Sequence, residues 1–166
     1  MNITIYARFS RLTSDRLLRI LSACPIVAML HAIGIDIIEI DRLRQALQRR
    51  PRLAARLFTE RERAYCDCRA DPAPHYAARF AAKEATAKAL GRWLRWHEVE
   101  VLSHDSGRPY ISLRGGAAAI AGIAAGSRLL VSLSHSRDYA VACVLLVVPK
   151  EIVGTDSNLP PGAARA

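Results

Sequence analysis

The sequence predicts an α+β fold in a single domain, with a mainly antiparallel sheet packed on one long alanine-rich helix. Three observations support this prediction: an alternating apolar segment at residues 31–38, an alanine-rich stretch at residues 72–90, and two pairs of apolar segments joined by short turns in the second half of the chain. The length of 166 residues and the hydrophobic content of 51% suit one globular domain with its own core.

The first elements are recognised by their ends. Residues 31–38 alternate as a strand, and the helix expected over residues 39–49 stops before Pro51. Thr59 and Glu62 have the spacing of a capping box, in which each side chain bonds the backbone N–H of the other residue. This spacing predicts a short helix with the sequence TERERAYC.

The central helix has both a start signal and a stop signal. Asp71 and Pro72 are a favourable cap and first residue, and Gly91 is suited to end a helix over residues 72–90. Small side chains allow a sheet to approach such a helix closely, and this stretch carries alanines at positions 77, 78, 81, 82, 85, 87 and 89.

The second half of the chain predicts two hairpins separated by a helix of small residues. The turn DSGRP joins the strands of the first hairpin, and two longer apolar strands form the second. The expected ranges are 97–104 and 109–113 for the first hairpin, 117–126 for the helix, and 129–136 and 139–147 for the second hairpin.

The two ends of the chain differ from its middle. We expect an N-terminal extension over residues 1–28, the folded domain over 29–150, and a disordered tail rich in proline and glycine over 151–166. No apolar run has the eighteen or so residues that a membrane span needs, so we expect no membrane span. The four cysteines lack the spacing of a zinc site, and free thiols in a cytoplasmic protein are the simplest interpretation.

The formal net charge of +9, most of it from arginine, indicates a polyanionic partner or substrate. Nucleic acid, an anionic membrane, an acidic protein and a phosphorylated small molecule all satisfy this requirement. A basic nucleic-acid-binding module has less support, because only 6% of the residues are aromatic and they do not alternate with the arginines in a recognisable motif.

An acidic residue interrupts the first strand. In the stretch GIDIIEI, Asp36 points to the face opposite Ile35 and Ile37, on the side of Gly34, where no side chain crowds it. A carboxylate beside a packed core is costly unless a positive or hydrogen-bonding group meets it. Asp36 therefore either caps the next helix, pairs with an arginine, or ligates a metal ion.

The central helix offers a partner for that acid. Phe80, Glu84 and Lys88 share one helical face, with Arg79 and Lys83 on an adjacent stripe. Glu84 and Lys88 alone would be an ordinary solvated ion pair. Close packing of the sheet on the alanines would instead bring Glu84 towards Asp36. Two carboxylates, with water and phosphate oxygens as further ligands, would suit Mg²⁺. One interpretation is therefore a magnesium enzyme that acts on a nucleotide pyrophosphate. Another is a scaffold protein whose helix is merely rich in alanine.

Five motifs carry a family resemblance. They cover about residues 31–148 and occur in the order GIDIIEIDRL, FTERERAYC, RFAAKEATAKALG, DSGRPYISL and VSLSHSRDYAVACVLL. Together they resemble the holo-[acyl-carrier-protein] synthases, the small bacterial class of 4′-phosphopantetheinyl transferases. The resemblance implies a transferase of lipid metabolism and fatty acid biosynthesis. It implies transfer of 4′-phosphopantetheine from coenzyme A to a serine of apo-acyl carrier protein, with release of adenosine 3′,5′-bisphosphate.

The resemblance also implies roles for individual residues. Asp36 and Glu84 match the Mg²⁺ ligands, and Lys88 matches a lysine that contacts the phosphate or helps to activate the serine. The general base stays open between Glu84 and a water on the metal. Coenzyme A contacts are expected at Arg79, Lys83, Gly91, Gly107, Arg108, Pro109, Ser134 and His135, and carrier-protein contacts at Arg42 and Arg49.

Two further expectations come from the same comparison of motifs. Family members are typically homotrimers whose site is shared between neighbouring subunits, and we expect the same here. After Gly91 this chain departs from the usual glycine- and threonine-containing loop and reads RWLRWHE. Trp93 and Trp96 either close over the pantetheine arm or pack in the core.

Overall fold

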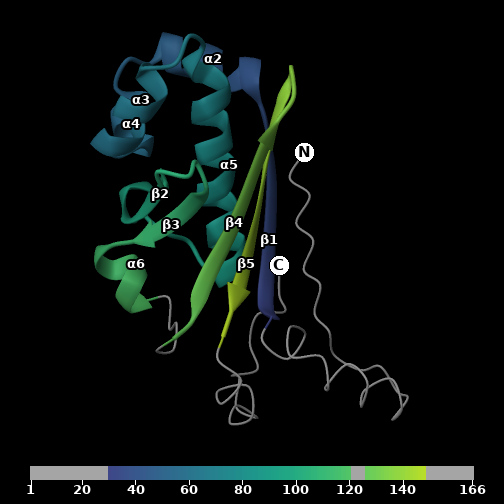
Figure 1. Cartoon of the computed structure of the whole chain (residues 1–166). Helices are drawn as coiled ribbons and strands as arrows, with labels where there is room; N and C mark the ends of the chain where they lie inside the picture. Colours follow the sequence, from purple (N-terminus) through teal and green to yellow (C-terminus); the bar gives the residue numbers. More distant parts are fainter. Residues whose placement is uncertain (1–29, 121–125, 149–166) are drawn as a thin grey trace, which may run out of the picture.

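The computed structural model describes residues 30–120 and 126–148. Its main sheet has three antiparallel strands in the order β1 (Leu30–Glu39), β5 (Tyr139–Val147) and β4 (Arg128–His135). The long helix α5 (Pro72–Leu90) runs along one face of this sheet, and a smaller hairpin of β2 (Val99–Ser103) and β3 (Pro109–Leu113) packs on the far side of the helix (Figure 1). The predicted α+β fold, with an antiparallel sheet on an alanine-rich helix, is confirmed.

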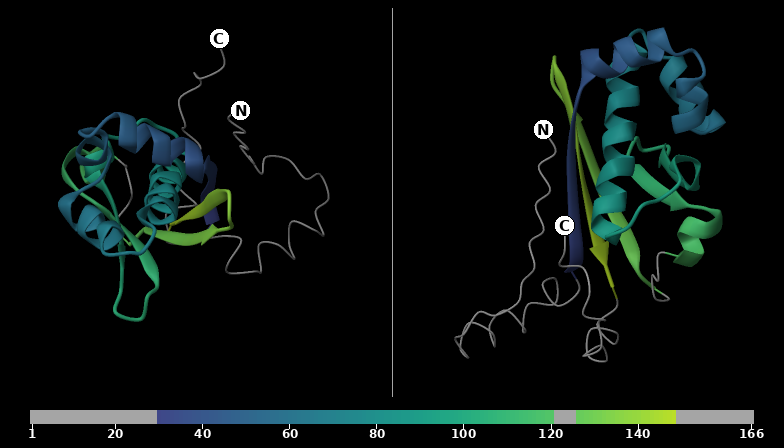
Figure 2. Two further views of the ribbon diagram at one scale, coloured as in Figure 1. Left: turned by 90° about the horizontal axis from the view of Figure 1, so that it is seen from above. Right: turned by 180° about the vertical axis from the view of Figure 1, so that it is seen from behind.

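Short helices fill the remaining positions. Three of them lie at the end of the molecule where α5 begins, and a 3-10 turn and a last helix flank the β2–β3 hairpin (Figures 1 and 2). These elements are α2 (Ile40–Arg49), α3 (Leu53–Leu57), α4 (Glu60–Asp67), η1 (Trp96–Glu98) and α6 (Gly115–Ile120). Helix α3 was not predicted, because Pro51 indicated only that a helix ends there.

Local signals set the helix boundaries as predicted. The Thr59 hydroxyl accepts a bond from the backbone N–H of Glu62, and the Glu62 carboxylate accepts one from the backbone N–H of Thr59, which completes the capping box of α4. The Asp71 side chain caps α5, and Gly91 ends it with a φ of 65°. The last helix begins at Gly115 rather than 117, and residues 121–125 of its predicted range lie outside the described part of the chain.

The sheet approaches α5 most closely at Gly34. A Cβ atom at this position would lie 1.9 Å from the carbonyl oxygen of Ala85 and 2.7 Å from the backbone nitrogen of Ala89. Around this contact, the helix face consists of buried alanines that pack on Ala142 and Val144 of β5. The expected close packing of sheet on helix is therefore present, and only glycine fits at position 34.

The alternation of β1 gives its two faces different neighbours. Gly34 and Asp36 pair with Val144 and Ala142, so they face α5 with those buried residues. Ile37 pairs with Val141 on the opposite face, where no helix of the described residues lies, and it is 56% exposed (Figure 2). The isoleucine face predicted as half-buried is thus the open face of the sheet.

Other expectations concern the ends and the cysteines. The N-terminal extension and the disordered tail lie outside the described residues, as does Cys24. Cys66, Cys68 and Cys143 are free thiols, as predicted. Among the described residues, no helix combines the length and the apolar character that crossing a membrane requires.

Candidate active site

A carboxylate–ammonium pair joins β1 to the last turn of α5. The Lys88 Nζ atom donates to Asp36 Oδ1 at 2.8 Å and to the carbonyl oxygen of Ile35 at 3.1 Å. The Asp36 side chain is only 11% exposed. Asp36 does not cap α2, whose N-cap is Glu39, and its cationic partner is a lysine rather than an arginine. From the sequence, Asp36 and Lys88 were expected in the same site, but a direct bond between them was not predicted.

Asp36, Glu84 and Lys88 together carry a surplus of negative charge, because two carboxylates share one ammonium group. The second oxygen of Asp36, Oδ2, is buried and has no hydrogen-bond partner. Glu84, one turn before Lys88 on α5, is half-buried, and burial raises the pKa of its carboxyl group, as does the charge of Asp36, while the charge of Lys88 lowers it. The charges of Asp36 and Lys88 thus act on the Glu84 carboxyl group in opposite directions.

This donor set fits a hard divalent cation. Two carboxylates, one with an unpartnered oxygen, face a single ammonium group, and a cation such as Mg²⁺ prefers oxygen ligands of this kind. The described residues contain no cluster of three or more acidic, histidine or cysteine side chains suited to a metal. A bound magnesium ion would therefore take its other ligands from water and substrate oxygens, as is usual for this ion.

A buried arginine lies further along α5. Arg79 is only 4% exposed, and its guanidinium group stacks over the Tyr65 ring at 3.8 Å from the centroid. Its Nη1 atom donates to the carbonyl oxygen of His75 at 3.4 Å, and its Nε atom has no partner. Within residues 30–120 and 126–148, no carboxylate forms an ion pair with Arg79, which leaves its charge available to an anionic ligand.

Two more basic groups lie near the same tyrosine, and a third lies beside one of them. The Arg69 guanidinium lies 4.3 Å from the Tyr65 ring centroid, and the His75 ring lies 6.0 Å from it. The His135 ring, at the end of β4, is 5.8 Å from that of His75. We call Arg69, His75, Arg79 and His135 the basic cluster. The structure thus brings the predicted Arg79 and His135 together and adds Arg69 and His75.

No separate sequence signal identifies the two added residues. Arg69 and His75 lie on either side of the cap of α5 and resemble ordinary residues at the start of a helix. His135 comes close to His75 only because β4 pairs with β5. The pKa of His75 is lowered by burial and then by the charges of Arg69, His135 and Arg79, while Asp71 opposes them weakly.

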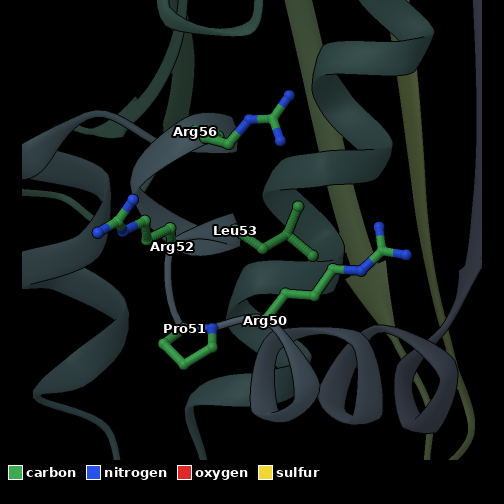
Figure 3. A pocket seen from close by; sticks show the side chains of 5 residues that line it. All are labelled: Arg50, Pro51, Arg52, Leu53 and Arg56. Atoms are coloured by element: carbon green, nitrogen blue, oxygen red, sulfur yellow. The ribbon is translucent and has the colours of Figure 1, made fainter.

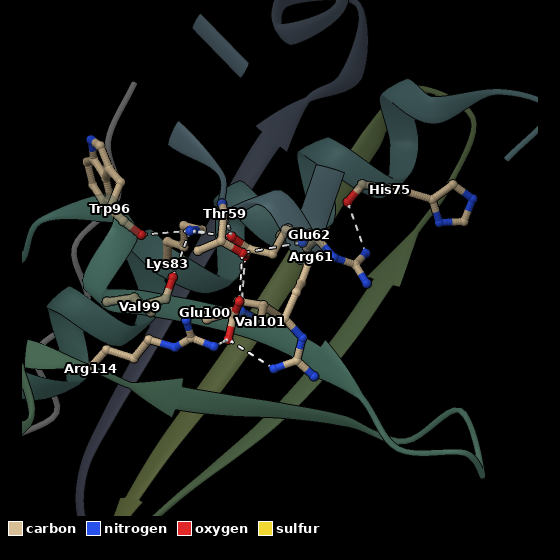
Figure 4. A network of polar contacts seen from close by, with 11 residues as sticks. Thr59, Arg61, Glu62, His75, Lys83, Trp96, Val99, Glu100, Val101 and Arg114 are labelled. Carbon is tan, nitrogen blue, oxygen red and sulfur yellow. Dashed lines mark hydrogen bonds and ion pairs between the residues drawn. The ribbon is translucent and has the colours of Figure 1, made fainter. Parts of the chain in front are cut away.

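Lys83 occupies a different environment from the one predicted. Its ammonium group is 0% exposed and donates to Glu62 Oε2 at 2.8 Å and to the carbonyl oxygens of Trp96 and Val99, each at 2.7 Å (Figure 4). All three donors are used inside the protein. This geometry does not support the expected contact of Lys83 with coenzyme A, because the stripe beside Glu84 turns towards β2 rather than towards solvent.

The remaining predicted cofactor residues are dispersed. Gly107, with a φ of 81°, forms the expected turn of the β2–β3 hairpin, together with Arg108 and Pro109. Gly91 is the C-terminal cap of α5. Ser134 pairs with Val141 and so lies on the open face of the sheet, opposite to His135. Only Arg79 and His135 of the predicted phosphate contacts are therefore neighbours.

Arginines gather where α2 turns into α3. Arg42 and Arg49 are exposed on α2, as a docking role requires. Beyond them, an open hollow of about 400 Å³ is lined by Arg50, Pro51, Arg52, Leu53 and Arg56 (Figure 3). Arg44, in contrast, is engaged with Asp41 and with Asp71.

The two tryptophans differ in burial. The half-buried Trp96 packs its ring on Phe80, with centroids 5.5 Å apart, and on Trp93 at 4.8 Å. Trp93 is 73% exposed. Trp96 is therefore partly packed in the core, whereas Trp93 is not a core residue.

The fold is that of a phosphopantetheine-transferring enzyme: the chain belongs to the 4′-phosphopantetheinyl transferase superfamily, whose model matches residues 32–144. Within it, the chain is similar to the holo-[acyl-carrier-protein] synthase of Moorella thermoacetica, with 47% identity over 121 residues that cover 71% of this chain and 94% of that protein. The synthase of Geobacter sulfurreducens is 45% identical over 126 residues, which cover 73% of this chain and 100% of that protein. The resemblance drawn from the five motifs is confirmed.

Solved structures agree with this assignment. The holo-(acyl-carrier-protein) synthase of Bacillus anthracis in complex with coenzyme A (3′,5′-ADP) aligns with a TM-score of 0.61 and 31% identity, over 73% of this chain and 99% of that chain. The Chronobacterium ammoniagenes complex of the synthase with coenzyme A aligns with a TM-score of 0.64 and 30% identity, over 71% of this chain and 97% of that chain.

Proposed function

We propose that this protein transfers the 4′-phosphopantetheine group of coenzyme A to a serine of apo-acyl carrier protein and releases adenosine 3′,5′-bisphosphate. The observation that carries the proposal is the meeting of Asp36, Glu84 and Lys88 between β1 and α5, inside a fold whose relatives are synthases of this kind. Two of the similar solved structures hold coenzyme A. We place the reaction in the cytoplasm, in fatty acid biosynthesis.

In this proposal, Asp36 and Glu84 hold Mg²⁺. When bound, the ion supplies positive charge that neutralises the pyrophosphate and the charge developing as its bond breaks. Lys88 adds a second positive charge, and its bonds to Asp36 and to the Ile35 carbonyl oxygen fix the position of that charge. Glu84 and a water on the ion are the two candidates to accept the serine proton, while Asp36 is held in an ion pair with Lys88.

The basic cluster binds the phosphate groups of the nucleotide. The support is the nearly complete burial of Arg79 without a carboxylate partner, which would be costly if no anion ever met it. His135 and Arg69 reach the same place from β4 and from the segment after α4. From the resemblance, the hairpin turn at Gly107, Arg108 and Pro109 contacts the adenosine.

The carrier protein docks on the arginine-rich turn between α2 and α3. Carrier proteins present an acidic helix around the target serine, and the exposed Arg42 and Arg49 with the neighbouring hollow offer a complementary charge. Steering by these charges increases the association rate and weakens as salt screens it.

We also propose a homotrimer. Its support is the open face of the sheet, where Leu30, Ile35, Ile37, Tyr139 and Val141 are exposed, since an apolar face of this kind is typical of a surface that another subunit covers. The number of subunits, and the sharing of the site between them, rest on the resemblance to the family.

The decisive experiment is intact-mass spectrometry of apo-acyl carrier protein after incubation with the enzyme, coenzyme A and Mg²⁺. We expect a gain of one phosphopantetheine. Asp36→Ala and Glu84→Gln should each reduce the rate by at least about 100-fold, because both remove a ligand of the charge-neutralising ion. Glu60→Gln, which changes an exposed acid on α4, is the matched control and should keep the native rate.

Two outcomes would contradict the proposal. A native transfer rate in the Asp36→Ala variant would contradict the proposal that Asp36 is a Mg²⁺ ligand. Binding of coenzyme A without any mass gain on the carrier would favour a magnesium enzyme acting on another nucleotide pyrophosphate. In the same assay, the KM for carrier protein should rise with ionic strength, and an unchanged KM would argue against docking on the arginines.

A further inference from the structure

The basic cluster has four positive or protonatable groups and little negative charge to balance them. Its members come from the segment after α4, from two turns of α5 and from the end of β4; three of them lie against Tyr65, and His135 lies beside His75. Asp71 is the acid that acts on His75, and its effect is weaker than those of Arg69, His135 and Arg79. Asp71 is itself engaged, because it accepts a bond from Arg44 at 2.7 Å and from the backbone N–H of Ala73 at 3.2 Å.

These surroundings decide the protonation of His75. Without a ligand, a proton on its imidazole would add a further positive charge beside Arg69, Arg79 and His135, and burial disfavours that charge as well. A phosphate group among the same residues would reverse the balance, since its two negative charges favour the imidazolium form. His75 is thus set to change its charge when the cluster receives an anion.

We propose that His75 is a phosphate-binding residue of this enzyme, and that binding of the nucleotide phosphomonoester draws one proton from solvent onto its imidazole ring. The inference rests on the proposed function, because the ligand is the phosphate of coenzyme A or of adenosine 3′,5′-bisphosphate. The step is balanced: the neutral imidazole gains a proton from the buffer, and the phosphate dianion stays deprotonated and accepts a bond from the resulting N–H group.

The consequence is a defined pH dependence. Because the ligand raises the pKa of His75, the complex binds more protons than the free protein at any pH between the two values. Affinity for adenosine 3′,5′-bisphosphate therefore increases as the pH falls through the pKa that His75 has in the complex. The gain ends at about pH 6, where the phosphate itself begins to protonate.

Isothermal titration calorimetry of the full chain with adenosine 3′,5′-bisphosphate tests the inference. At pH 7.5, titrations in buffers with different heats of ionisation count the protons taken up on binding. We expect a clear fractional uptake for the wild-type protein and a smaller one for His75→Gln. His97→Gln, which changes an exposed histidine on η1, is the matched control and should behave as the wild type.

The affinities provide a second measurement. His75→Gln should bind about 10-fold more weakly than the wild type at pH 6.5 and nearly as well at pH 8.5, since only the charged imidazole is lost. Wild-type binding without proton uptake, or equal affinities of the two proteins at pH 6.5, would overturn the inference and leave the proposed function intact. Absence of nucleotide binding in a wild-type protein that also fails to modify the carrier would instead overturn the proposed function.

Discussion

At the scale of single residues, Gly34 is the position that most tightly constrains the site. It allows β1 to lie against the backbone of α5 at Ala85 and Ala89, and the nearby Asp36 then reaches Lys88. A larger side chain would have to push the strand away from the helix, because its Cβ would meet backbone atoms that cannot rotate aside. The position of Asp36 therefore depends on the lack of a side chain at Gly34.

This constraint predicts a large effect of Gly34→Ala. We expect a loss of about 3 kcal/mol or more in the free energy of unfolding, because overpacking against backbone atoms cannot be relieved by a rotamer change. Denaturant unfolding measures the loss. Gly91→Ala is the comparison: it is strained by a φ of 65° but meets nothing within 4 Å, and it should cost only about 1 kcal/mol. Equal losses in the two variants would contradict the explanation.

The sequence predicted the acidic residues of the site better than the basic ones. Asp36 and Glu84 could be predicted because a strand pattern and an alanine-lined helix imply a close approach. Arg69 and His75 could not, because their meeting with His135 depends on how β4 pairs with β5 and on the rotation of α5. Lys83 was misjudged for a related reason, since helical spacing tells which residues share a stripe and not which element that stripe will face.

At the scale of elements, a buried polar network ties α4, α5 and the β2–β3 hairpin together. Glu62 of α4 accepts bonds from Lys83 of α5 and from the backbone N–H of Val101 in β2 at 3.0 Å. Glu100 of β2 accepts a bond from the Thr59 hydroxyl at 2.7 Å and pairs with Arg114 (Figure 4). The hairpin that carries the turn at Gly107 is thereby held on the helix that carries Glu84.

Breaking this network from one side should be costly. Lys83→Met leaves the Glu62 carboxylate buried without its ammonium partner, and we expect a loss of about 3–5 kcal/mol in the free energy of unfolding. Chemical denaturation measures it, and the double variant Lys83→Met/Glu62→Gln should recover part of the loss, because the buried charge is gone while the amide oxygen can still accept from a backbone N–H group. If both variants were equally destabilised, packing of the lysine stem rather than charge would be the cause.

Element boundaries were predictable wherever a cap defines them. The capping box at Thr59 and Glu62, the start of α5 at Asp71 and its end at Gly91 all depend on neighbouring backbone groups and need no tertiary information. Helix α3 lacks such a signal, since Arg52 provides no side-chain cap. The face of β1 that would be buried was also not decidable from its alternation, because both faces of the strand carry few charges.

At the scale of the whole molecule, the helices cover one side of the main sheet, while its other side carries exposed apolar residues. Burial of that side in a homotrimer predicts a mass of three chains by light scattering. Ile37→Lys should lower the mass towards that of one chain, because a charge at a 56%-exposed apolar position would be desolvated on assembly. Ile37→Val, which keeps the position apolar, should leave the mass unchanged.

A monomeric wild-type protein at micromolar concentration would contradict the assembly, and a variant mass that stays at three chains would exclude Ile37 from the contact. Transfer activity measured alongside separates assembly from chemistry. If the site is shared, the Ile37→Lys protein should lose activity together with mass, and addition of more enzyme should partly restore it.

Strand β1 has the proposed metal-binding carboxylate on one side and the apolar isoleucines on the other, separated only by the thickness of the backbone. In the proposed trimer, a small molecule that replaces the neighbouring subunit on the isoleucine side would inhibit by shifting the strand, and surplus coenzyme A would not displace it. Screening for compounds whose inhibition resists excess coenzyme A is the practical way to find ligands of this second kind.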